Sequence, residues 1–62
     1  MAITKSEIIT RLDAYIVEMT SELNTIMTNG NISVALDELE MLRCVAGIQR
    51  SENAKTWVEA NL

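Results

Sequence analysis

The sequence contains no histidine, no proline and no phenylalanine, and its only cysteine is Cys44. Histidine is the usual general base and a common metal ligand, so its absence removes the side chain that most hydrolytic and metal sites use. A single cysteine cannot form an intrachain disulfide, and a zinc site needs several thiolate or imidazole ligands. We therefore expect no catalytic residues, no metal and no cofactor.

Basic residues are also scarce, because five Lys and Arg stand against nine Asp and Glu, for a net charge of −4. Nucleic-acid binding needs a patch of basic side chains against the phosphates, so we expect no nucleic-acid partner. No run approaches the ~20 apolar residues of a membrane span, and the opening MAITKSEIIT lacks the apolar stretch of a secretion signal. Together with the lone cysteine, this predicts a protein of the reducing cytoplasm with no membrane contact.

The chain is rich in hydrophobic residues, which make up 48% of its 62 residues. Such a length allows one domain, residues 1–62, whose core alone supplies roughly 3–5 kcal/mol of stability. Without disulfide or metal, the remaining source of stability is a partner. We expect a homo-oligomer, with a dimer as the first choice, and a further protein partner.

The first predicted helix spans about residues 5–28. Its apolar residues recur at alternating steps of three and four, the heptad spacing of a packing seam; they are Ile9, Leu12, Ile16, Met19, Leu23 and Ile26. Thr4 and Glu7 form a Thr-x-x-Glu capping box that predicts the start at Lys5. The triplet Asn29-Gly30-Asn31 predicts the end, with Gly30 as a left-handed cap.

A connection this short returns the second helix antiparallel to the first. We expect this helix over about 33–50, with Leu39, Leu42, Val45 and Ala46 facing Leu12, Ile16, Met19 and Leu23. Beyond Gln49 the apolar phase changes. Either the chain breaks, with Ser51 capping a separate segment over about 52–61, or one continuous helix carries two contact faces.

The residues with potential chemistry have simpler structural interpretations. Cys44 could act as a nucleophile only beside a basic group, and burial as a small apolar residue is the expectation. Trp57 lies in the segment of changed phase, and it either packs on the end of the bundle or serves as an interface hot spot. The interface candidates are Ile9, Leu12, Ile16, Met19, Leu23, Leu39, Leu42, Trp57 and Val58.

The predicted fold class is all-α, an antiparallel helical hairpin with a possible short third helix, dimerising into a four-helix-bundle-like core. In length and helical layout it is similar to plasmid copy-control proteins of the Rop type, whose basic and aromatic RNA-reading face has no counterpart here. The opening MAIT followed by Leu12-Asp13-Ala14-Tyr15 resembles small phage head–tail joining proteins of the gpW type. That family continues into a β-hairpin, for which Asn29-Gly30-Asn31 leaves no room, so this resemblance implies a phage-like context only.

These observations predict a small non-enzymatic regulator or inhibitor, phage- or plasmid-like, that binds another protein through its helical faces. The alternative is a structural assembly component of a phage particle or another larger complex. The two differ in their partner, because a regulator binds an enzyme or regulatory complex and an assembly component binds the proteins of its own particle.

Overall fold

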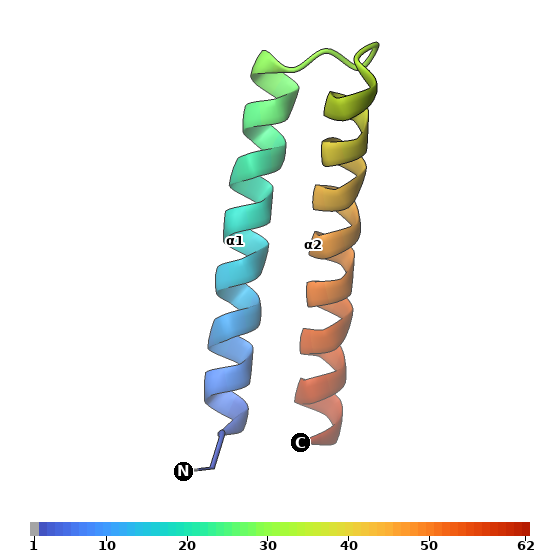
Figure 1. Ribbon diagram of the computed structural model, residues 1–62. Helices are drawn as coiled ribbons and strands as arrows, with labels where there is room; N and C mark the ends of the chain where they lie inside the picture. Colours follow the sequence, from blue (N-terminus) through green and yellow to red (C-terminus); the bar gives the residue numbers. More distant parts are fainter. Residues whose placement is uncertain (1) are drawn as a thin grey trace.

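The computed structural model describes residues 2–62 as two antiparallel helices that pack side by side (Figure 1). Helix α1 spans Lys5–Asn29 and helix α2 spans Ala35–Asn61. The hairpin measures 45 × 16 × 16 Å, and both ends of the chain lie at the same end of it (Figure 1). The all-α helical hairpin is thus confirmed. Within residues 2–62, neither helix combines the length and the apolar character needed to cross a membrane.

The start of α1 is where the capping sequence predicts it. The Oγ1 of Thr4 accepts a hydrogen bond of 3.2 Å from the backbone N–H of Glu7, and the carbonyl of Thr4 accepts one from Ile8. The first of these bonds satisfies a backbone donor that has no partner within the first turn of a helix, and the second is the first hydrogen bond of the helix itself. The end is close to the prediction too, because α1 continues to Asn29, one residue past the expected end.

The prediction that Gly30 is a left-handed cap is wrong. Its backbone is extended, with φ −86° and ψ 170°, and no residue in the described range has a positive φ. The N–H of Gly30 donates to the carbonyl of Ile26 at 2.6 Å, and a Cβ on Gly30 would lie 2.5 Å from that same oxygen. The position therefore favours glycine because of this close approach, and not because of the backbone angle.

The loop is held by polar contacts, and α2 begins at Ala35, slightly later than predicted. The side chain of Asn31 accepts a 2.9 Å hydrogen bond from the N–H of Ser33, and the N–H of Asn31 donates to Asp37 Oδ2 at 2.9 Å. Val34 occupies the N-cap position without a side-chain capping bond. The Asp37 carboxylate thus orders the loop backbone from within the first turn of α2.

Helix α2 is continuous over 27 residues and does not break near Ser51. The second alternative, one helix with two faces, therefore describes the structure. The residues of α2 with restricted exposure on the side of α1 are Met41, Cys44, Gly47, Ile48, Ser51, Ala54, Lys55 and Val58. Many are small or polar, so α2 contributes a modest apolar surface to the hairpin.

The predicted partners of α1 on α2 are wrong. Leu39, Leu42 and Val45 are 44%, 53% and 37% exposed and lie away from α1. A continuous helix can present only one line of residues along its whole length to its neighbour. The line through Cys44 and Val58 repeats at heptad spacing along the whole of α2, whereas the apolar line through Leu42 ends after the first few turns.

Candidate protein-binding surface

The hairpin encloses very little apolar surface of its own. Within residues 2–62, only Cys44 and Val58 count as buried hydrophobic residues, at 6% and 7% exposure, and α1 has none. The α1 residues of the heptad seam are half-buried on the side of α2; they are Ile9, Leu12, Ile16, Met19, Leu23 and Ile26. A two-helix contact covers one side of each helix, so the other sides remain open to water or to a partner.

The first exposed apolar feature is the outer stripe of α2, which we define as Ala35, Leu39, Leu42 and Ala46. These residues recur at steps of four, three and four, which places them in line along the helix. Successive helical residues are about 100° apart, so Leu42 and Ala46 lie about 160° from Cys44. The outer stripe therefore points away from α1.

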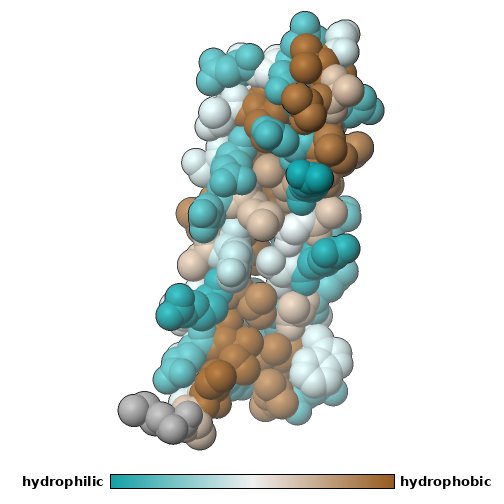
Figure 2. Space-filling model, viewed as in Figure 1, coloured by the Kyte–Doolittle hydropathy of each residue, from teal (hydrophilic) through white to brown (hydrophobic). Residues whose placement is uncertain are grey.

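The second feature is the loop-end patch, defined as Met27, Ile32, Val34 and Leu36. Their exposed fractions are 69%, 63%, 45% and 71%. Figure 2 shows apolar side chains gathered where α2 begins, separated by polar side chains from a second apolar region nearer the chain ends. Contiguous apolar surface of this kind marks an interaction site more often than scattered single residues do.

Trp57 lies on the outer side of α2, further along the helix. It is 58% exposed, whereas its neighbour Val58 is buried against α1. The outer side of α2 thus carries leucines in its first turns and Trp57 later, whereas the line of residues through Cys44 and Val58 faces α1 along the whole helix. Of the two alternatives for Trp57, the hairpin leaves the indole free to contact another protein.

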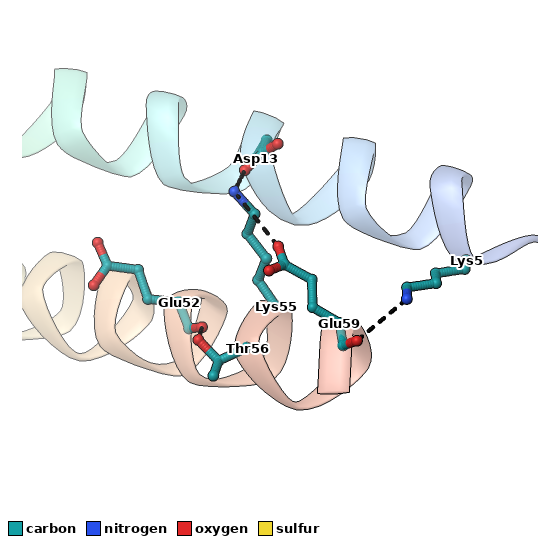
Figure 3. Close-up of polar contacts among 6 residues, drawn as sticks. All are labelled: Lys5, Asp13, Glu52, Lys55, Thr56 and Glu59. Atoms are coloured by element: carbon teal, nitrogen blue, oxygen red, sulfur yellow. Dashed lines mark hydrogen bonds and ion pairs between the residues drawn. The ribbon is translucent and has the colours of Figure 1, made fainter. Parts of the chain in front are cut away.

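Ionic contacts join the two helices at the end opposite the loop (Figure 3). Lys55 Nζ lies 2.9 Å from Asp13 Oδ1 and 4.0 Å from Glu59 Oε1. The hydrogen bond and the charge of Asp13 raise the pKa of Lys55 above its ordinary value, with smaller contributions from Glu59 and Glu52. The pair is partly exposed, so it fixes the pairing of the helices more than it stabilises them.

Lys5 closes the same end of the hairpin. Its Nζ donates to the carbonyl oxygens of Glu59 at 3.2 Å and Leu62 at 3.0 Å. The last carbonyls of a helix have no partner within it, and a cation there also interacts favourably with the helix dipole. The first turn of α1 thereby caps the last turn of α2 (Figure 3).

The strongest candidate for chemistry is Cys44, which borders a groove lined by Glu22, Glu40 and Arg43. Its Sγ lies 3.8 Å from Glu22 Oε2, as the donor of a weak hydrogen bond. Burial raises the pKa of the Cys44 thiol, and the negative charges of Glu22 and Glu40 raise it further. The thiolate is the nucleophile, so this environment suppresses reactivity. Among residues 2–62, no group of three or more His, Cys, Asp or Glu side chains could hold a metal ion.

The interface candidates from the sequence thus divide into two sets. The α1 seam and Val58 meet within the hairpin, whereas Leu39, Leu42 and Trp57 remain exposed. The sequence analysis did not single out Ile32 or Leu36 as surface residues. Their signal was present, because apolar residues flank both sides of the Asn-Gly-Asn turn.

No protein-family model, curated protein or solved structure matches this chain.

Proposed function

We propose that this protein is a small non-enzymatic regulator or inhibitor that acts as a homodimer and binds a target protein through exposed helix faces. The observation that supports this most is the distribution of apolar side chains. Large hydrophobic residues such as Leu36, Leu42 and Trp57 are more than half exposed, while very few are buried. Monomeric proteins rarely leave such surface uncovered without an interaction that uses it.

The total surface supports a dimer. A compact folded monomer of 6.9 kDa exposes about 4,000 Å². This chain exposes 4923 Å², which is about 900 Å² more. A stable protein–protein interface buries about 800 Å² on each partner. Association of two hairpins through exposed apolar surface would cover an area of this size.

Trp57 is the candidate contact for the target. Tryptophan is enriched among interface residues whose truncation costs about 2 kcal/mol or more of binding free energy. The residue is 58% exposed, on a helix whose opposite side is already occupied by α1. A rigid helix that presents one large aromatic side chain is suited to insertion into a groove of another protein.

The test is to capture the target with immobilised wild-type protein, identify it, and repeat the binding with both components purified. We expect Trp57→Ala to weaken this binding by about 2 kcal/mol or more. Because the ring is exposed, the stability of the hairpin should change by no more than about 0.5 kcal/mol. Val17→Ala, at another exposed site (70%), is the matched control and should bind like the wild type.

The identity of the target decides between the two candidate functions. An enzyme or regulatory complex whose activity changes on binding supports a regulator. A set of particle proteins supports the structural assembly component, which the similarity of the opening residues to phage head–tail joining proteins also favours. A lower melting temperature for Trp57→Ala with unchanged target binding would contradict the proposed role of this residue.

A further inference from the structure

We propose that the outer stripe of α2 is the dimer interface, and that it packs against the outer stripe of a second copy of this chain with the two α2 helices parallel. This inference rests on the homodimer in the proposed function and specifies its geometry. It assigns the stripe to self-association and leaves α1 on the outside of the dimer.

The stripe has the spacing that helix pairing requires. Ala35, Leu39, Leu42 and Ala46 occupy successive a and d positions of a heptad, and Val45 adds apolar surface beside them at 37% exposure. Because α1 occupies the opposite side of α2, the stripe can pack on a second helix while the hairpin stays intact. The small residues Ala35 and Ala46 at the two ends of the stripe allow close approach.

The overlap between helices favours the parallel arrangement. An antiparallel pair that matches stripe to stripe would overlap only over about 35–46, the first three turns of α2. A parallel pair can extend along the whole of Ala35–Asn61, with Trp57 beside the line of contact and not on it. The parallel pair therefore allows the larger contact, and a stable dimer buries roughly 800 Å² on each partner. It also brings the loop-end patches of the two copies together at one end.

Charge favours the same arrangement. Glu38 precedes Leu39 and Arg43 follows Leu42, so the two charges flank the stripe on opposite sides. In a parallel pair, these flanking positions face each other, and Glu38 of each copy lies beside Arg43 of the other. In an antiparallel pair, like positions face each other, which opposes glutamate to glutamate and arginine to arginine. The antiparallel pair therefore carries repulsion where the parallel pair carries attraction.

Disulfide trapping tests the interface. In a Cys44→Ala background, a single cysteine is introduced as Leu39→Cys, Leu42→Cys or, as control, Val17→Cys, and each protein is equilibrated with oxidised and reduced glutathione. Identical residues at a and d positions meet across a parallel two-fold pair. We therefore expect both Leu39→Cys and Leu42→Cys to run as covalent dimers on a non-reducing gel. Val17→Cys should run as a monomer there, because its cysteine lies outside the interface. Circular dichroism confirms that all three are helical.

Charge reversal is a second test that does not touch the apolar surface. We expect Arg43→Glu to weaken dimerisation about five- to thirtyfold, because two symmetric ion pairs of roughly 0.5–1 kcal/mol become repulsive. The double variant Glu38→Arg with Arg43→Glu should restore the wild-type dissociation constant. The effect should shrink at high salt, where exposed charges are screened.

The possible failures are distinguishable. A wild-type protein that sediments as a monomer overturns both this inference and the proposed dimer. A wild-type dimer in which neither Leu39→Cys nor Leu42→Cys cross-links overturns the parallel pairing of the two stripes, and cross-linking of Val17→Cys instead overturns the interface itself. Cross-linking at only one of the two stripe positions, or failure of the double charge reversal to restore association, overturns the parallel orientation.

Discussion

Gly47 shows how one residue sets the distance between the helices. It lies within α2 on the side of α1, and a Cβ at this position would collide with the Sδ of Met19. Glycine costs a helix interior about 1 kcal/mol relative to alanine, so its presence here needs a compensating contact. The methionine side chain fills the notch that the missing Cβ leaves.

We predict that Gly47→Ala destabilises the hairpin by up to about 2 kcal/mol, because an overpacking cost of about 1–3 kcal/mol exceeds the gain in helix propensity. In a Met19→Ala background the collision disappears, and the same substitution should stabilise by about 1 kcal/mol. Urea unfolding of the four proteins of this cycle measures the coupling. Equal effects of Gly47→Ala in both backgrounds would show that the two residues do not pack together.

Cys44 shows how local charge controls reactivity. Burial and the neighbouring carboxylates of Glu22 and Glu40 raise the pKa of its thiol, so the folded protein holds this proton more tightly than the unfolded chain. The resulting stabilisation is fully present below the unfolded pKa of about 8.5 and is lost as the pH rises through the folded value.

We therefore predict slow alkylation of Cys44 by iodoacetamide in the folded protein at mildly alkaline pH, and fast alkylation in denaturant. The pH profile of the folded rate should be displaced toward higher pH relative to the unfolded chain. Val17→Cys in a Cys44→Ala background provides an exposed thiol as control. A folded Cys44 that reacts as fast as this control at every pH would refute the protective environment.

At the scale of the element, α2 is a helix with two unlike sides. The side toward α1 combines small, polar and apolar residues, among them Cys44, Ser51 and Val58. The outer side carries leucines in its first turns and Trp57 later. The stronger apolar side is thus the one that the hairpin leaves open, so substitutions on the two sides should have different consequences.

We predict that Leu12→Ala, on the α1 seam, lowers stability by about 2 kcal/mol at every protein concentration, because it opens space between the two helices. Leu42 is 53% exposed in the hairpin, so Leu42→Ala should act mainly through the dimer. At high protein concentration, the melting temperature of Leu42→Ala should be lower than that of the wild type. It should also lack the dependence on protein concentration that the wild type shows. Melting curves recorded at low and high micromolar concentration separate the two cases. Identical behaviour of both variants would contradict the assignment of sides.

For the whole molecule, the elongated hairpin with very little interior predicts association. Sedimentation equilibrium at micromolar concentration should give twice the 6.9 kDa mass of the chain. The driving force is the burial of apolar surface, worth about 25 cal/mol per Å², so dimerisation should carry a negative heat-capacity change in dilution calorimetry. A monomer that still unfolds cooperatively at this concentration would reject the dimer.

Sequence alone determined the features that depend on residues close to one another along the chain. Helix α1, its start at Lys5, its heptad seam, the antiparallel return and the change of apolar phase within α2 all follow from local spacing and capping. The tertiary structure decided which side of α2 meets α1, because two sides of that helix are apolar over part of its length. The line through Cys44 and Val58 keeps heptad spacing along the whole of α2, and packing along the full length of α1 selects it over the shorter apolar line through Leu42. The same selection leaves Leu39, Leu42 and Trp57 exposed, and so creates the surface through which we propose the protein acts.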